Sequence, residues 1–212
     1  MTIEKDFFRQ VMGRFTTGVT VVTTGSKGVP GGLTVNAFCS VSLNPPLILV
    51  SVDCASTTLP LLRECQKFAV NILTDKQEHL SRCFATPSKD RFEHFCHAPY
   101  HVAATGAPVL DGALAFIDAH VVAEYPGGDH VLFLGQVEAL GTAERVVFAD
   151  DASRVNSTLL TPAAANGNLV EDEGTPLVYY RGQYRHLASN YREPSLTKTY
   201  DKDAEEQRSR GR

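Results

Sequence analysis

Short polar side chains recur along LTVNAFCSVSLNPP, residues 33–46, and none of them is charged. Every second residue on one face is polar or aromatic: Thr34, Asn36, Phe38, Ser40 and Ser42. The residues between them are apolar: Val35, Ala37, Cys39, Val41 and Leu43. This period of two predicts a β-strand, on which neighbours on one face lie about 7 Å apart. Hydroxyl and amide groups at that spacing suit a flat heteroaromatic ligand with a ribityl or phosphate arm. The alternative is an amphipathic strand that faces solvent.

A second polar feature is the turn within SVDCASTTL, residues 51–59, where an apolar strand leads into a helix start. Free backbone N–H groups and the positive end of the helix dipole favour phosphate there, and Ser56, Thr57 and Thr58 could complete the site. The hydroxyls could equally serve only as helix caps. The sequence contains neither a P-loop pattern nor a strand–GxGxxG–helix unit, so neither standard nucleotide-binding fold is predicted.

Two further motifs place a positive or titratable side chain beside apolar residues. In SKDRFEHF, Lys89 and Arg91 lie close to Phe92, so a cation could hold a phosphate while the ring stacks on a base. Surface ion pairing is the alternative for this motif. In GGDHVLFLG, His130 follows a glycine hairpin and begins an apolar strand. It could reach a ligand from there, or it could be an ordinary exposed histidine.

The histidine and cysteine residues predict neither a metal site nor a disulfide framework. HFCHAPYH contains four potential zinc ligands, but their spacing matches no common structural zinc site: His94, Cys96, His97 and His101. The five cysteines are scattered and form no C-x-x-C pair: Cys39, Cys54, Cys65, Cys83 and Cys96. This arrangement favours free thiols in a reducing compartment. There is no G-x-S-x-G element of a serine hydrolase either.

The composition is that of one ordinary globular domain, with 212 residues of which 43% are hydrophobic and 21% charged. A net charge of −4 and a pI of ≈ 6.0 argue against nucleic acid or an anionic membrane as partner, because both require a basic surface. No run approaches the roughly 20 apolar residues of a membrane span, and the first residues lack the apolar segment of a signal peptide. A cytoplasmic location is therefore expected.

Hydrophobic periodicity predicts the elements that must position these motifs. Helical spacing marks residues 3–15, and further helices are predicted to begin at Ser56 or Thr57 and at Asp75. Strands are predicted at residues 18–24, 33–43, 47–53, 68–73, 114–125, 130–140 and 176–187. The continuous apolar run LILVSVD should be buried on both faces, and PGGD predicts a hairpin. The pattern favours a mainly antiparallel barrel with peripheral helices.

Two segments do not fit this pattern. Residues 148–175 are rich in Ala, Asn, Asp and Thr and are longer than a normal connection between strands, so they are predicted to form a functional lid or a mobile loop. The tail after Asn190 is charged and nearly free of apolar residues, which predicts disorder. The folded domain is therefore expected to span residues 1–189.

Seven segments, taken together and in order, resemble the short-chain flavin reductases, the small partners of two-component flavin-dependent monooxygenases. They are FRQVMGRFTTGVTVVTT, GLTVNAFCSVSLNPPLILVSVD, FAVNIL, LSRCFA, DRF, GDHVLFLGQV and PLVYYRGQY. The resemblance covers residues 7–187 except 148–175, and its most specific parts are T-x-N-x-x-x-S-V-S and G-D-H. It implies a split β-barrel that binds FMN or FAD, as a homodimer with the flavin sites near the subunit interface.

The resemblance also implies an activity. NADH or NADPH would be oxidised, hydride would pass to the flavin, and reduced flavin would leave for a separate monooxygenase. Two alternatives stay open. One is a flavoprotein on the same barrel with a different activity, such as an oxidase or oxygenase, and the long 148–175 segment supports it. The other is a non-enzymatic module that binds flavin or haem. The sequence does not decide between FMN and FAD, or between NADH and NADPH.

Carried over motif by motif, the resemblance implies a role for each of the following residues. Thr34, Asn36 and Ala37 would lie by the flavin ring and ribityl arm, with Ser40 and Ser42 nearer the phosphate. Ser51, Val52 and Asp53 would flank the ring edge, and Ser56 and Thr58 would bind phosphate. Phe84, Ala85, Arg91 and Phe92 would approach the distal part of the flavin, and Tyr184 matches an aromatic position of the last strand. His130 would position the nicotinamide.

Overall fold

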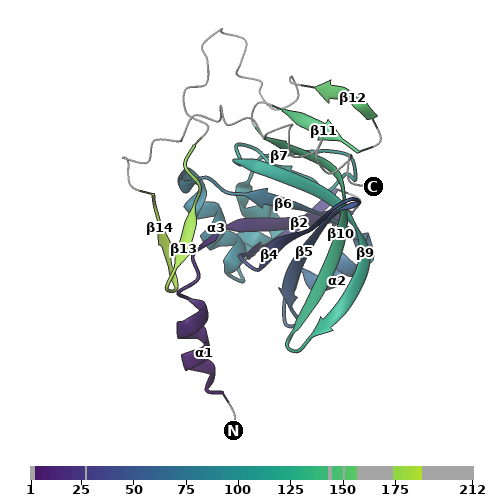
Figure 1. The fold of residues 1–212 in the computed structure, drawn as a ribbon. Coiled ribbons are helices and arrows are strands. Elements are labelled where there is room, and N and C mark those ends of the chain that lie inside the picture. Colours follow the sequence, from purple (N-terminus) through teal and green to yellow (C-terminus); the bar gives the residue numbers. More distant parts are fainter. Residues whose placement is uncertain (1–2, 27, 143–144, 150, 157–173, 188–212) are drawn as a thin grey trace, which may run out of the picture.

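Most strands of the computed structural model belong to one antiparallel sheet, and the structure describes residues 3–26, 28–142, 145–149, 151–156 and 174–187. The sheet runs in the order β12 (Asp151–Asn156), β11 (Val146–Phe148), β10 (His130–Thr142), β9 (Ala115–Gly127), β6 (Lys67–Ile72), β2 (Thr20–Ser26) and β3 (Val29–Val35). A branch adds β5 (Pro46–Asp53) to β10 and β4 (Phe38–Leu43) to β5 (Figure 1). The mainly antiparallel β prediction is confirmed.

The long hairpin β9–β10 is the centre of the sheet, and the PGGD motif forms its turn as predicted. The pairing of β9 with β10 has two register shifts, of which the first leaves Val122 of β9 unpaired and the second leaves Glu138 of β10 unpaired. The edge of β10 that faces away from β9 pairs with two strands in succession. Residues 130–136 pair with β5, and residues 139–141 pair with β11. This change of partner separates the β4–β5 branch from β11 and β12.

The hydrophobic core lies between β2, β3, β5, β6 and β10, where Val22, Leu33, Val50, Phe68 and Phe133 pack together. The prediction that residues 47–53 are buried on both faces is wrong. Burial alternates along β5, with one face in the core and the other only half-buried. The apolar run did not distinguish these two cases, because the second face also begins with two leucines, Leu47 and Leu49.

The prediction of one continuous strand over residues 33–43 is wrong as well. β3 ends at Val35 and pairs with β2, whereas β4 begins at Phe38 and pairs with β5. The chain changes partner at Asn36 and Ala37, and the alternating pattern does not record such a change. The apolar face of β4 points outward, since Val41 is exposed and Leu43 is 91% exposed.

The helices cover the sheet unevenly. α2 (Leu59–Cys65) buries Leu59 and Leu62, while α3 (Glu78–Ala85), which follows the short helix η1 (Asp75–Gln77), buries Leu80 and Phe84. α4 (Lys89–His94) and η2 (Phe95–His97) come next. None of the eight residues of α1 (Lys5–Met12), all of which the structure describes, is buried. No helix among the described residues is long and apolar enough to cross a membrane.

The C-terminal segment forms a hairpin rather than the predicted long strand over residues 176–187. β13 (Val178–Tyr180) and β14 (Gln183–Arg185) are joined by Arg181 and Gly182, and β1 (Thr17–Gly18) pairs with β13. A second small hairpin joins β7 (Tyr100–Val102) to β8 (Pro108–Leu110). The predicted 148–175 loop contains β12 near its start. Residues 157–173 and the predicted disordered tail lie outside the described residues.

The prediction of five free thiols is wrong for two of them, because Cys83 and Cys96 form a disulfide with their Cα atoms 6.0 Å apart. The bridge joins the end of α3 to η2. Cys96 is therefore not available as a zinc ligand, and among the described residues no group of His, Cys, Asp and Glu is arranged to hold a metal ion. Cys39, Cys54 and Cys65 are free.

Candidate functional site

A groove of about 680 Å³ lies between α1 and the β13–β14 hairpin on one side and β4 and β5 on the other. This volume falls within the range of roughly 300–1,000 Å³ that is usual for small-molecule sites. The lining residues are Phe8, Arg9, Met12, Gly13, Phe15, Thr17, Asn36, Ala37, Phe38, Cys39, Leu49, Ser51, Tyr179 and Gly182. Three predicted site residues are brought together here, namely Asn36, Ala37 and Ser51.

The change of strand partner creates the polar part of this groove. Asn36 and Ala37 occupy the crossing between β3 and β4, where their side chains are exposed. The Ser51 backbone N–H donates to the Ala37 carbonyl at 3.0 Å and ties the crossing to β5. Along β5, Leu49 and Ser51 line the groove while Val50 and Val52 face the core. Phe38 also packs against the core, so one wall of the groove is rigid.

A second group of predicted residues gathers where β3 passes under the start of α2. The Arg91 guanidinium donates from Nε to the Gly32 carbonyl at 3.0 Å and from Nη2 to Thr58 Oγ1 at 2.9 Å. Thr58 Oγ1 in turn donates to the same Gly32 carbonyl at 3.1 Å. Burial lowers the pKa of Arg91 from its ordinary value. Arg91 and Thr58 are thus mutually bound and buried, so their first role here is to hold β3, α2 and α4 together.

Ser56 lies beside this group and is the more accessible of the two predicted phosphate ligands. Its side chain is half-buried, and its hydroxyl accepts from the Thr58 backbone N–H at 3.3 Å. The hydroxyl hydrogen of Ser56 has no acceptor among the described residues. From Gly32, β3 continues to the crossing at Asn36, and four extended residues cover about 13 Å. The groove and the Ser56 region therefore lie along the same strand.

His130 occupies a different place, at the tip of the β9–β10 hairpin. Its Nδ1 lies 2.8 Å from Asp129 Oδ1, and this hydrogen bond, together with the histidine's charge, lowers the pKa of Asp129. The backbone of His130 is in register with Asp53, whose carboxylate accepts from the Ala55 N–H at 2.7 Å. His130 is partly exposed and does not line the groove within this chain.

The remaining predicted residues are dispersed. Val52 and Phe84 lie in the core, and Phe84 closes against Gly32, where a Cβ would come within 2.9 Å of the Phe84 ring. Ser40, Ala85 and Phe92 are exposed. The Ser42 hydroxyl accepts from the Asn44 backbone N–H at 3.2 Å. None of these side chains lines the groove.

Thr34 and Tyr184 do not line the groove, and both form hydrogen bonds to Ser81 of α3. Thr34 Oγ1 donates to the Ser81 carbonyl at 2.6 Å, and the Ser81 hydroxyl lies 2.8 Å from the Tyr184 hydroxyl. The Arg82 guanidinium lies over the Tyr184 ring at 4.6 Å. These contacts anchor the last hairpin to the body of the domain. Its groove-facing ring is Tyr179, which lies edge-on to Tyr184 at 5.4 Å.

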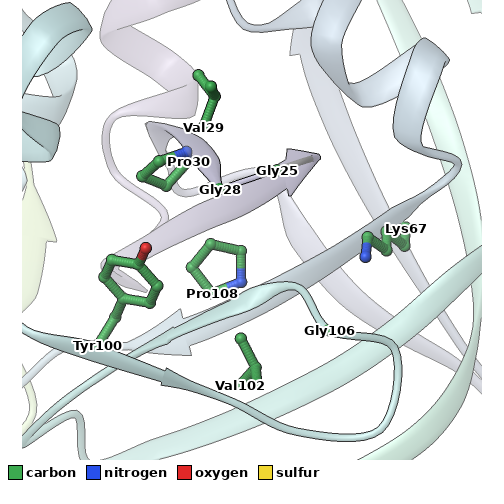
Figure 2. A pocket seen from close by; sticks show the side chains of 9 residues that line it. All are labelled: Gly25, Gly28, Val29, Pro30, Lys67, Tyr100, Val102, Gly106 and Pro108. Atoms are coloured by element: carbon green, nitrogen blue, oxygen red, sulfur yellow. The ribbon is translucent and has the colours of Figure 1, made fainter.

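Sequence reasoning missed the apolar wall of the groove, which is formed by Phe8, Met12, Phe15 and Tyr179. The helical spacing of the first three was visible, but it indicated only an amphipathic helix. A smaller cavity of about 200 Å³ lies between the β2–β3 turn and the β7–β8 hairpin. Figure 2 shows Tyr100, Pro30 and Pro108 around it, with Lys67 at its edge. It contains none of the predicted site residues.

An antiparallel sheet with a groove lined by amide, hydroxyl and aromatic groups defines a β protein built to bind a ligand the size of a cofactor. The sequence pattern described as "Flavin reductase like domain" matches residues 12–188. The chain therefore belongs to the flavin reductase-like family, and the predicted family resemblance is confirmed.

Similar proteins agree with this membership. The chain is 36% identical to the actinorhodin polyketide dimerase of Streptomyces coelicolor, over 78% of this chain and 92% of that protein. It is 32% identical to the reductase subunit of a flavin-dependent monooxygenase from Mycobacterium tuberculosis, over 86% of this chain and 82% of that protein. Among solved structures, the NADH:FAD oxidoreductase of Streptomyces globisporus with NAD and FAD fragments matches with a TM-score of 0.67 and 30% identity, over 89% of this chain and 96% of that one.

Proposed function

We propose that this protein is an NAD(P)H:flavin oxidoreductase that reduces FMN or FAD and supplies the reduced flavin to a separate monooxygenase. The groove carries this proposal, because it combines a polar strand crossing with an apolar aromatic wall in a volume suited to a flavin. Membership of the flavin reductase-like family supports it. So do the relatives named as a monooxygenase reductase subunit and as an NADH:FAD oxidoreductase. We place the reaction in the cytoplasm, where nicotinamide cofactors are supplied.

The residues of the groove fit a flavin ring. Asn36, Ser51 and the backbone at Ala37 supply hydrogen-bonding groups for ring carbonyls and nitrogens, and none of them brings a charge. Leu49, Phe38 and Tyr179 supply apolar surface for the faces of the ring. We place the ribityl arm along β3 toward Ser56, where its phosphate would meet the start of α2. Arg91 and Thr58 hold this region in place from behind.

In this proposal the residues of the chain bind the flavin, orient its ring and exclude water from it. When bound, the flavin accepts the hydride that the reduced nicotinamide gives up, so the cofactors carry the chemistry. Asn36 and Ser51 fix the ring against β5, because the crossing is tied to β5 by the Ser51–Ala37 hydrogen bond. The apolar wall keeps solvent from the ring faces. We assign the guiding of the nicotinamide to His130, which is oriented by its hydrogen bond to Asp129.

His130→Ala is expected to raise the KM for NADH about 3- to 10-fold, the value of one ordinary hydrogen bond, and to leave the flavin Kd within about twofold. The reason is that His130 lies outside the groove that we assign to the flavin. Steady-state kinetics and a fluorescence titration with FMN measure the two quantities. A variant that loses flavin, yet turns over normally when flavin is resupplied, would contradict the assignment.

Ser56→Ala is expected to weaken FMN binding about 3- to 10-fold and to leave riboflavin binding unchanged, because riboflavin has no phosphate. Ser56 is preferred to Thr58 for this test because the Thr58 hydroxyl is already bonded to Gly32 and Arg91. Isothermal titration with the two flavins gives both constants. If the variant lost the same affinity for FMN and for riboflavin, Ser56 would not be a ligand of the flavin phosphate.

We also propose that the sheet forms a split barrel and that the protein is a homodimer. Apolar side chains of α1 and of the segment just after it are exposed in the part of the chain that the structure describes, among them Phe7, Phe8 and Phe15, the last 72% exposed. Val41 and Leu43 of β4 add to this surface. A second copy would cover it, since apolar surface of this extent marks an association site. Sedimentation equilibrium should give twice the mass of 23.1 kDa.

One relative supports a second candidate function. Its name, actinorhodin polyketide dimerase, describes an activity on a polyketide. NADH oxidation in air separates the two possibilities. A rate that increases with added free flavin supports the reductase, whereas a protein that binds flavin without such a rate supports the second function.

A further inference from the structure

Three arginines surround a hollow that opens beside the groove. Arg9, Arg14 and Arg181 line it, together with Gln10, Gly13 and Gly182, and its volume is about 540 Å³. Arg9, Gly13 and Gly182 also line the groove, so the two spaces are direct neighbours. A ligand that fills the groove and extends past the end of α1 would enter this hollow.

The backbone is built to bring the arginines together. In Figure 1 the turn of the β13–β14 hairpin meets the end of α1. The Arg181 N–H donates to the Gly13 carbonyl at 2.9 Å, and a Cβ at Gly13 would lie 3.5 Å from the Arg181 Cα. This hydrogen bond joins two segments that are far apart in the sequence. This contact places Arg181 beside Arg9 and Arg14.

Arg181 stands at a backbone position that an arginine does not favour. Tyr180 and Gln183 are paired, so Arg181 and Gly182 form a two-residue hairpin loop, and both have positive φ angles of 52° and 75°. Loops of this kind favour Asn or Gly at the first position, because a larger L-residue is strained there. A strained residue at a cavity indicates a functional reason for its side chain.

The positive charges of the hollow are only partly compensated. Arg9 pairs with Asp6 at 3.2 Å, and both side chains are exposed. Arg14 and Arg181 have no side-chain partner in the part of the chain that the structure describes. Guanidinium groups bind phosphate oxygens in a two-pronged geometry, and a ligand with two negative charges would relieve their mutual repulsion.

We propose that Arg9, Arg14 and Arg181 form a subsite for the pyrophosphate of a dinucleotide, while its ring system lies in the adjoining groove. The inference rests on the proposed function in one respect, namely that the groove holds a cofactor ring. The dinucleotide is NAD(P)H, because the phosphate of the flavin is assigned to Ser56 at the start of α2, which does not line this hollow. The subsite therefore recognises the hydride donor and not the flavin.

The test uses the full-length protein with Arg14→Ala and Arg181→Asn combined, because asparagine suits the turn and should keep it folded. ADP-ribose, which has the pyrophosphate but no nicotinamide or flavin ring, is the direct probe. We expect its Kd, measured by isothermal titration, to rise about 10- to 100-fold, the value of one or two charge-assisted contacts. Arg145→Ala, an exposed arginine outside the hollow, should leave this Kd unchanged.

Kinetic arms identify the source of the pyrophosphate. We expect a raised KM for NADH with unchanged FAD affinity, whereas weaker binding of FAD but not FMN would contradict the assignment to the nicotinamide dinucleotide. Unchanged ADP-ribose binding, or an equal loss of riboflavin binding, would overturn the subsite. If the wild-type protein reduced no flavin but still bound ADP-ribose through these arginines, the proposed function would fail and the subsite would stand.

Discussion

Arg91→Ala is expected to lower the free energy of unfolding by about 3 kcal/mol, because hydrogen bonds to a charged group each contribute roughly 1.5–3 kcal/mol. The variant removes both donors, to the Gly32 carbonyl and to Thr58 Oγ1, and leaves a cavity where a buried side chain stood. For a domain of this size the melting temperature should fall by about 6–12 °C. Differential scanning calorimetry measures this directly.

The same variant should also weaken FMN binding, since β3 and the start of α2 would no longer be held together. Arg91→Lys should be intermediate, because a lysine keeps the charge but lacks the two-pronged donor. Lys89→Ala is the matched control on the same helix. Lys89 is exposed and pairs with Glu93 at 3.4 Å, so its loss should change stability by less than about 0.5 kcal/mol. Wild-type stability and flavin affinity in Arg91→Ala would disprove this role.

Replacing Cys83 and Cys96 together by serine is expected to cost about 3 kcal/mol, the value for a loop of this length. The bridge spans 13 residues and encloses α4 with Arg91. Cys96 and its two neighbours, Phe95 and His97, lie in the left-handed region, with φ angles of 55°, 50° and 52°. Left-handed residues with a Cβ are unfavourable, so this turn should relax once the bridge is lost.

A reducing agent provides the second arm of this experiment. Dithiothreitol reduces the disulfide to two thiols and is itself oxidised, so it should lower the melting temperature of the wild-type protein to that of the double variant. It should have no effect on the double variant. Cys54→Ser, a change at an exposed free thiol, is the control and should respond to reduction like the wild type. A wild-type melting temperature unaffected by reduction would show that the bridge contributes nothing.

Local patterns were sufficient wherever one segment specifies its own structure. The β9–β10 hairpin follows from two apolar runs around PGGD, and α1 follows from the spacing of its apolar residues. The family could also be recognised from the sequence, because motifs such as T-x-N-x-x-x-S-V-S are short and continuous in the chain. These motifs correctly predicted three residues that line the groove, namely Asn36, Ala37 and Ser51.

The sequence by itself determined the mainly antiparallel class, most of the elements and the family. Only the tertiary structure decided which polar groups are free. The Thr58 hydroxyl looked available in its own segment, but Arg91, 33 residues away, occupies it. The Cys83–Cys96 bridge, the break at Asn36 and the meeting of Arg181 with Gly13 depend in the same way on segments distant in the chain. Periodicity describes which face of an element is apolar, whereas the partner that meets this face is chosen by the packing of the whole domain.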